Sequence, residues 1–168
     1  MSGLQGRERL QPSVLDRLLD DAPSRKRDGP DQVFTTVQLR QCVLRDLTWL
    51  LNTSNLATLS DLSLTPLVAR STLNFGIPGF AGLLESSTKS GTLEAELADA
   101  IRAYEPRIRP ESLKVHVQAG HNNGSATTLV FTIEGELWAQ PAPLQLFLET
   151  TIEIETRQAV VSEVREAR

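Results

Sequence analysis

The hydrophobic pattern of this chain changes its period once, at Pro110, and that change constrains the fold more than any other feature of the sequence. Before Pro110, apolar residues recur every three or four positions, which is typical of helices with one buried face. After Pro110, they alternate with polar residues, which is typical of strands with one buried face. A run of helices followed by a run of strands predicts an α+β fold, in which the helices pack on one face of a sheet.

Three segments before Pro110 are predicted to be helical, and each has its own start signal. Thr35 and Gln38 have the spacing of a capping box. Thr65 precedes a proline, which is favoured at the first helical position, and Thr92 precedes two glutamates, which the helix dipole favours in a first turn. We expect helices over residues 36–51, 66–74 and 92–105, the last ended by Pro106.

The alternating part of the sequence predicts three strands. They are expected over residues 113–118, 129–137 and 144–155. Because a parallel connection needs a long crossover, three strands joined by short loops predict an antiparallel meander. In the third strand, the even-numbered residues are expected to face the helices and the odd-numbered residues to face outward.

The chain is predicted to hold a single α+β domain over residues 31–168, preceded by an arm over residues 1–30. A length of 168 residues suits one domain. Within the arm, Ser13 and Asp16 form a capping-box pattern at the start of a helix of about two turns. Because a helix this short is unstable alone in water, we expect it to dock on another surface. The polar residues 24–31 predict a flexible connector.

Charge and composition argue against several classes of function. A formal charge of −4 and an isoelectric point near 5.2 match nucleic acid poorly, because nucleic-acid binding relies on clustered basic residues. No stretch approaches the 18 to 20 or so consecutive apolar residues of a membrane span, and the polar N-terminus argues against a signal peptide. Cys42 is the single cysteine, so no intramolecular disulfide forms and we expect a reducing cytosol.

No motif for catalysis or for cofactor binding occurs in the sequence. The glycine motifs of nucleotide-binding proteins and the nucleophile elbow of hydrolases are absent. His116 and His121 lack metal-ligand spacing, so we expect neither a metal nor a cofactor. Glutamates in the predicted strands could pair as the acids of a glycosidase, but their parity places them opposite the apolar face. We therefore expect solubilising charges there and no enzymatic activity.

The segment Glu105-Pro106-Arg107 joins the last predicted helix to the first predicted strand. One interpretation is a helix end with a local ion pair. The other is a rigid recognition corner, at which Arg107 makes bidentate contacts to a carboxylate or to carbonyl groups of a partner. We expect the ion pair to be exposed, so that loss of Arg107 leaves the domain folded. The residues alone leave both interpretations open.

Three segments, taken in order, resemble one known family. They are RDLTWLLNT at residues 45–53, STLNFGIPGF at residues 71–80 and YEPRI at residues 104–108. Together they are similar to the TssE family of type VI secretion baseplate subunits, which is akin to a phage baseplate wedge family that is labelled lysozyme-like. The resemblance extends from about Val14 to the last strand. Ser54 stands where the family usually has arginine.

The resemblance implies a structural role without catalysis. Proteins of this family lie in a baseplate wedge at the cytoplasmic face of the inner membrane, with the partner subunits TssF, TssG and TssK. The resemblance also implies that Glu105, Pro106 and Arg107 hold the wedge core, and that the contractile sheath of TssB and TssC starts to polymerise from the sheet. The family label leaves a peptidoglycan-cleaving, lysozyme-like glycosidase as the alternative.

The predicted strand over residues 144–155 is the expected contact for the sheath protein. The open edge of a small meander can accept a strand from another chain through backbone hydrogen bonds. We expect this strand to form such an edge, with its outward-facing glutamates selecting a basic partner; the alternative is that it is central and that the strand over 113–118 provides the edge. The predicted contact residues are Gln145, Glu149, Thr151, Glu153 and Glu155.

Overall fold

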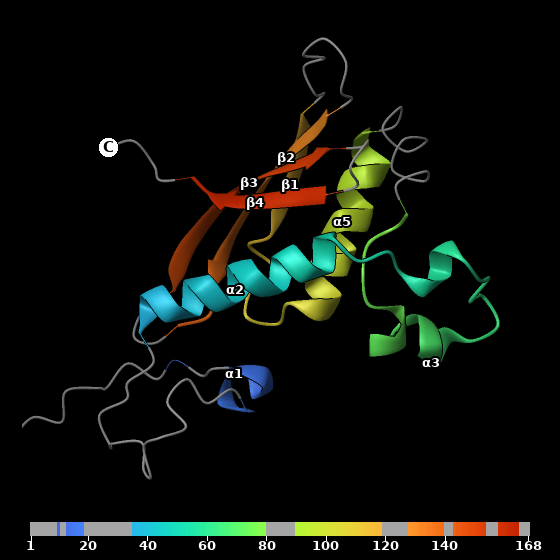
Figure 1. Cartoon of the computed structure of the whole chain (residues 1–168), viewed down its shortest axis with the longest axis horizontal. Coiled ribbons are helices and arrows are strands. Elements are labelled where there is room, and N and C mark those ends of the chain that lie inside the picture. The colour runs from blue at the N-terminus through green and yellow to red at the C-terminus, as the bar shows by residue number, and fades with distance from the viewer. Residues whose placement is uncertain are drawn as a thin grey trace, which may run out of the picture.

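A computed structural model of the chain describes residues 10, 13–18, 35–79, 90–118, 128–139, 143–153 and 158–164. The helices are α1 (Val14–Leu18), α2 (Thr36–Leu51), α3 (Pro66–Ala69) and α5 (Ser90–Tyr104), with the 3₁₀ helices η1 (Leu56–Thr58) and η2 (Thr72–Asn74). The strands are β1 (Lys114–Gln118), β2 (Thr128–Leu137), β3 (Leu144–Glu153) and β4 (Gln158–Glu163). Helices precede strands, as predicted (Figure 1). The predicted connector over residues 24–31 lies outside the described residues.

The sheet is an antiparallel meander of four strands in the order β1-β2-β3-β4. The predicted meander is confirmed, but the predicted number of three strands is wrong. The sequence pattern does not predict β4, because this strand buries only Ala159 fully and places two valines side by side.

The prediction of an exposed edge at residues 144–155 is also wrong. β3 pairs with β2 along one side and with β4 along the other; Thr151, for example, lies between Val130 and Val160. From Leu148 to Glu153, its backbone groups are therefore bonded within the sheet on both sides and cannot accept a further strand. The edges of the sheet are β1 and β4.

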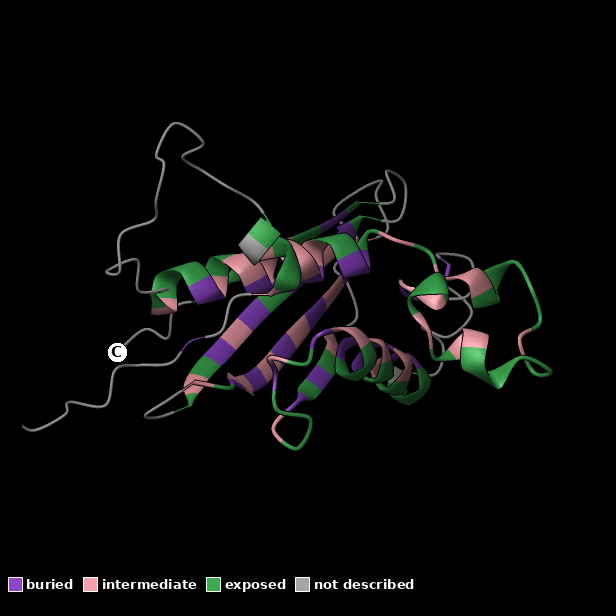
Figure 2. Cartoon of the chain, turned by 90° about the horizontal axis from the view of Figure 1, so that it is seen from below, coloured by how far each residue is buried: buried purple, intermediate pink, exposed green. Residues whose placement is uncertain are grey.

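The two long strands bury alternate residues, as predicted. In β2 the odd-numbered residues are buried, and in β3 the buried residues are even-numbered. Figure 2 shows this alternation along both ribbons. The largest fully buried side chain, Phe131, lies in β2. The glutamates of both strands lie at positions opposite this apolar face.

The helices α2 and α5 cover the apolar face of the sheet. α2 packs beside β4 and α5 packs beside β1 (Figure 1). α2 begins with the predicted capping box of Thr35 and Gln38. Its buried side chains have the predicted helical spacing and are Leu39, Val43, Leu47, Leu50 and Leu51. Among the described residues, no helix has both the length and the apolar character needed to cross a membrane.

The helix predicted over residues 66–74 ends early. Only α3 is α-helical; a turn follows at Arg70, and η2 completes the segment. The side chain of Asn74 donates to the carbonyl oxygen of Ala69 at 3.0 Å, and the Ser71 hydroxyl accepts from the N–H of Leu73 at 3.2 Å. These side chains take backbone groups that a continuing α-helix would use, so the helix stops.

The end of the first segment of the family resemblance lies beside the second segment, with a parallel bridge between Ser54 and Ile77. The N–H of Ile77 donates to Thr53 O at 2.8 Å, and the N–H of Asn55 donates to Ile77 O at 2.9 Å. Gly76 has a φ of +125°, and a Cβ there would lie 2.4 Å from Thr53 O. A side chain at this position would strain the backbone of Gly76 and collide with the backbone of Thr53, so this close pairing requires glycine.

Candidate protein-binding site at the end of α5

The backbone of Arg107 is fixed between a helix and the sheet. The N–H of Glu105 donates to Ile101 O at 2.8 Å and forms the last bond of α5. After Pro106, the carbonyl oxygen of Arg107 accepts from the N–H of Trp138 at 2.8 Å, just beyond the end of β2. The segment thus leaves the helix and bonds to the sheet within three residues. These bonds fix the backbone that carries the Arg107 side chain.

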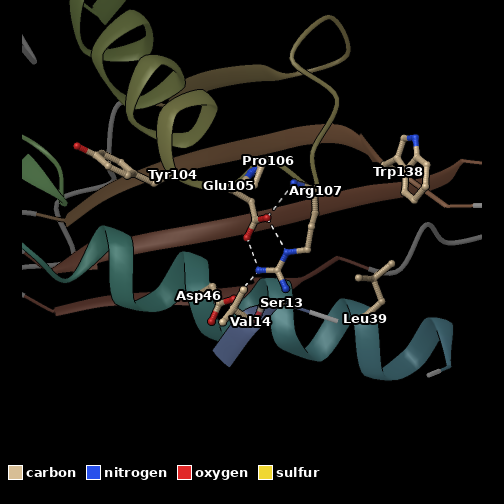
Figure 3. Close-up of a pocket in the computed structure, with 9 residues that line it drawn as sticks. All are labelled: Ser13, Val14, Leu39, Asp46, Tyr104, Glu105, Pro106, Arg107 and Trp138. Carbon is tan, nitrogen blue, oxygen red and sulfur yellow. Dashed lines mark hydrogen bonds and ion pairs between the residues drawn. The ribbon is translucent and has the colours of Figure 1, made fainter. Parts of the chain in front are cut away.

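The Arg107 side chain makes a two-pronged contact with Glu105. Its Nε donates to Glu105 Oε1 at 2.7 Å, and its Nη2 donates to Glu105 Oε2 at 2.6 Å (Figure 3). Nη2 also donates to Asp46 Oδ2 on α2. The Glu105 side chain is 2% exposed and that of Arg107 is 14% exposed. The prediction of an exposed ion pair is therefore wrong, because α2 packs over the corner.

Two further charged side chains connect this corner to the N-terminal helix α1. Arg45 on α2 donates through Nη2 to Asp16 Oδ1 at 2.6 Å and through Nε to Asp46 Oδ1 at 2.8 Å. Asp16 Oδ2 lies 3.8 Å from Arg107 Nη1. We call Asp16, Arg45, Asp46, Glu105 and Arg107 the charge cluster. Its three carboxylates and two guanidiniums join α1, α2 and the end of α5.

α1 docks through its polar side rather than its apolar side. Ser13 and Asp16 form the predicted capping box, with Asp16 N–H donating to Ser13 Oγ at 3.2 Å and Ser13 N–H donating to Asp16 Oδ2 at 3.0 Å. The Asp16 side chain is buried against the cluster. Val14 and Leu18, by contrast, are exposed. The helix is therefore held by charge and presents apolar side chains outward.

Pairing favours the ionised forms of Asp16 and Arg107. Burial raises the pKa of Asp16, but hydrogen bonds from Ser13 and Arg45 outweigh it, and the pKa falls from 3.8 to about 2. Burial lowers the pKa of Arg107, but bonds to Glu105 and Asp46 outweigh it and raise that pKa above its ordinary value. Burial and a hydrogen bond to Asp16 raise the pKa of the Cys42 thiol, which argues against a reactive thiolate.

A pocket of about 420 Å³ opens beside the charge cluster (Figure 3). Among the described residues, Arg107 Nη1 has no hydrogen-bond acceptor, although it is buried. The pocket combines a charged base with apolar walls and can receive a carbonyl or carboxylate group. Its lining residues are Ser13, Val14, Leu39, Asp46, Tyr104, Glu105, Pro106, Arg107 and Trp138.

The structure separates the two groups of predicted contact residues. Glu105, Pro106 and Arg107 lie on the side of the sheet that the helices cover, whereas the predicted residues of β3 occupy its odd-numbered, outward positions. Gln145, Glu149 and Glu153 are exposed, and Thr151 is half-buried. Glu155 lies outside the described residues. Binding at either group stays a prediction.

Sequence reasoning missed three members of the charge cluster, Asp16, Arg45 and Asp46. Arg45 and Asp46 lie on the polar side of the predicted helix, where side chains are expected to contact solvent. The capping-box pattern accounts for Asp16, so the sequence does not indicate its contact with Arg45. One feature of the sequence could have indicated the contact between Asp46 and Arg107: each of these residues lies in a segment that resembles the family.

One family of known proteins matches this chain. The model of that family is described as baseplate wedge protein gp25 and matches residues 37–142, which is more than half of the chain. The matched span runs from α2 into the loop after β2 and includes Asp46, Glu105 and Arg107. No curated protein matches the chain. The chain therefore belongs to the family of baseplate wedge proteins, whose members are structural parts of phage-tail-like baseplates.

Proposed function

We propose that this protein is the TssE-type wedge subunit of a type VI secretion baseplate. In this role it joins the wedge subunits TssF, TssG and TssK at the cytoplasmic face of the inner membrane, and it provides the sheet from which a sheath of TssB and TssC starts to assemble. The family match supports a baseplate role, and the TssE-like segments favour the secretion system over a phage tail.

Contacts among the three TssE-like segments support this assignment. Asp46 of the first segment binds Arg107 of the third. The hydroxyl of Tyr104 in the third segment donates to the carbonyl oxygen of Ser71 in the second at 3.0 Å. The rings of Phe75 and Tyr104 also meet edge to face, with their centroids 5.2 Å apart. The segments thus form one connected unit, so the resemblance rests on residues that depend on one another.

The single observation that carries the binding role is the Arg107 guanidinium, which is fixed beside an open pocket. Glu105 and Asp46 fix the guanidinium, and Nη1 is left without an acceptor among the described residues. Asp16 Oδ2 lies 3.8 Å from Nη1, too far to accept a hydrogen bond. A buried donor without an acceptor costs about 1–3 kcal/mol, so an acceptor from another subunit recovers part of that cost on binding. A fixed, largely desolvated arginine is also typical of interface hot spots.

Exposed apolar side chains favour assembly with other subunits. Several described leucines and one valine are at least 71% exposed, which a free monomer has no reason to maintain. Two lie on α1, beside the charge cluster, and the others on the segment from η1 to η2. They are Val14, Leu18, Leu59, Leu64, Leu67 and Leu73.

The two edges of the sheet differ in a way that favours β4 as the sheath contact. On the β1 edge, the N–H of Val117 donates to Glu94 Oε1 at 2.9 Å, so α5 takes a backbone donor that an added strand would need. On the β4 edge, Val161 and Glu163 direct their backbone groups away from β3, because in an antiparallel pair alternate residues face alternate sides. We therefore move the proposed strand addition from β3 to β4.

Catalysis is not part of the proposed function. Both carboxylate oxygens of Glu105 accept hydrogen bonds from Arg107, so this side chain is engaged in an ion pair rather than placed as the acid of a glycosidase. The glutamates of β2 and β3 lie at outward-facing positions rather than in a cleft. We expect the purified protein to release no fragments from peptidoglycan.

The test is a pull-down of the tagged full chain from its host cells, with identification of the proteins that co-purify. We expect wedge subunits to co-purify with the unchanged chain. With Arg107→Lys, the amount of co-purified subunits should fall at least tenfold, because lysine keeps the charge of arginine but not its planar guanidinium group. Arg102→Lys is the matched control, since Arg102 is an exposed arginine on α5 that binds only Asp99 among the described residues. Peptidoglycan cleavage by the purified protein, or normal co-purification by Arg107→Lys, would contradict the proposal.

A further inference from the structure

The carboxamide of Asn52 is bonded to the outer edge of β4. Its Oδ1 accepts from the N–H of Ala159 at 2.8 Å, and its Nδ2 donates to the carbonyl oxygen of Ala159 at 2.9 Å. Nδ2 also donates to Thr48 O at 2.7 Å, and the N–H of Asn52 is bonded to the end of α2. The side chain is therefore anchored to the helix and reaches across to the strand.

This arrangement imitates one residue of an added strand. Ala159 lies opposite Ile152 of β3 and directs both of its backbone groups away from β3. A carboxamide carries a donor and an acceptor in one plane, as a peptide group does, so it satisfies both groups at once. Asn52 thus occupies the place that an incoming strand would take at this position.

The next two outward-facing positions of β4 differ from Ala159. Val161 and Glu163 have the same orientation by the alternation of the strand. Arg40, near the other end of α2, binds the carboxylate of Glu163 and, through Nη2, the carbonyl oxygen of Gln145 at 2.9 Å. It makes no described bond to the backbone of Glu163. Among the described residues, no further hydrogen bond occupies the outward backbone groups of Val161 and Glu163, whereas both groups of Ala159 are bonded to Asn52.

We propose that Asn52 is the stop that sets the register of the strand added to β4. The added strand is an extended segment of the sheath protein; it pairs at Val161 and Glu163 and ends before Ala159. Register needs such a device, because a slip of one residue turns every side chain of the added strand to the opposite face. This inference rests on the proposed function, and it adds the residue that determines where pairing ends.

The first test is amide hydrogen exchange of the free full chain, resolved by residue with NMR. Asn52→Leu keeps the size of the side chain and removes the carboxamide. We expect the Ala159 amide to exchange at least about fivefold faster, since it loses its acceptor, and the Val160 amide to change little. Gln41→Leu is the matched control, because Gln41 is an exposed carboxamide on α2.

The second test repeats the measurement with purified sheath protein in excess. In the unchanged chain we expect added protection at Val161 and Glu163 and none at Ala159. In Asn52→Leu, protection extends to Ala159, while Gln41→Leu behaves as the unchanged chain.

Each other outcome has a separate meaning. If the sheath protein protects Val161 and Glu163 but never Ala159 in Asn52→Leu, Asn52 is not the stop, while strand addition stands. If no β4 amide of the unchanged chain gains protection, strand addition at this edge fails, and this inference fails with it. Should Asn52→Leu unfold, Asn52→Ala replaces it. If both unfold, as followed by circular dichroism, Asn52 serves the fold and the proposal is overturned.

Discussion

Charged side chains of α2 bind other elements at two places, the charge cluster and the β4 edge, and the two differ in how far water reaches them. In the charge cluster, the side chains of Arg107 and Glu105 are 14% and 2% exposed. At the β4 edge, the side chains of Arg40 and Glu163 are 31% and 29% exposed. Removing one partner of a buried pair leaves an uncompensated charge, whereas water solvates the partner left at an exposed pair. The same two residue types therefore give a firm joint in one place and a weak one in the other.

This difference agrees with the two proposed tasks. A joint between wedge subunits needs a fixed guanidinium, and Glu105 and Asp46 hold it on both sides. An edge that receives another strand needs backbone groups that are not already committed. Between the bonds of Asn52 and Arg40, no described hydrogen bond occupies the outward backbone groups of Val161.

The largest expected effect is that of Arg107→Ala on stability. The substitution leaves Glu105 buried without a counter-charge and should lower the free energy of unfolding by about 3 kcal/mol. For a chain of this length, that corresponds to a fall in Tm of roughly 6–12 °C. Urea and thermal unfolding of the purified chain measure it.

Arg102→Ala is the control for that measurement, because it removes an exposed arginine paired with exposed Asp99. We expect a change within about 0.5 kcal/mol. If Arg107→Ala also stays within that range, the charge cluster is no firmer than a surface ion pair, and the contrast between the two places disappears.

A smaller effect is expected from Asp16→Asn, and it should depend on pH. The folded pKa of Asp16 is about 2, below the ordinary 3.8, so its ionised form stabilises the fold above pH 3.8. This contribution is lost as the pH falls from 3.8 towards 2, because the carboxylate then becomes protonated. At neutral pH we expect Asp16→Asn to cost about 1 kcal/mol, because asparagine keeps the size of this buried side chain but loses its charge-assisted hydrogen bonds.

The measurement is urea unfolding of both chains at neutral pH and at about pH 3, with the difference shrinking in acid. Asp99→Asn, at an exposed aspartate, should show a difference near zero at both pH values. A difference for Asp16→Asn that is as large in acid as at neutral pH would show that Asp16 acts through its shape and not its charge.

Much of the fold follows from the sequence, because burial imposes a period on long elements. The stripes of α2 and α5 and the alternation of β2 and β3 give their type and buried face directly. The sequence does not predict β4, because a short edge strand buries few residues. α3 ends earlier than its helix propensity predicts, because the side chains of Ser71 and Asn74 bind backbone groups that a longer helix would use. Local side-chain bonds of this kind leave no periodic signal.

Of the residues that form the candidate site, the sequence indicates only the central one, Arg107. Arg107 stands out because Glu105 and Pro106 precede it, but its contact with Asp46 spans 61 positions and depends on how α2 packs. Asn52 marks the end of a helix in the sequence, while its bonds to Ala159 span 107 positions. Polar residues that join distant segments have no spacing rule, so only the folded chain brings them together.

The smallest expected effect is that of Arg40→Ala at the β4 edge, and salt gives the sharpest measure of it. An exposed pair contributes about 0.5 kcal/mol, so a double-mutant cycle of Arg40→Ala and Glu163→Ala should give a coupling energy near that value at about 0.1 M salt. At about 1 M salt, the Debye length falls to about 3 Å and the coupling should approach zero. The equivalent cycle of Arg107→Ala and Asp46→Ala should keep most of its coupling, because less water reaches that pair. A coupling energy of more than about 2 kcal/mol for Arg40 and Glu163, or one that persists at high salt, would mean that α2 binds β4 as firmly as it binds the charge cluster. An edge bound so firmly would be a poor acceptor for a further strand.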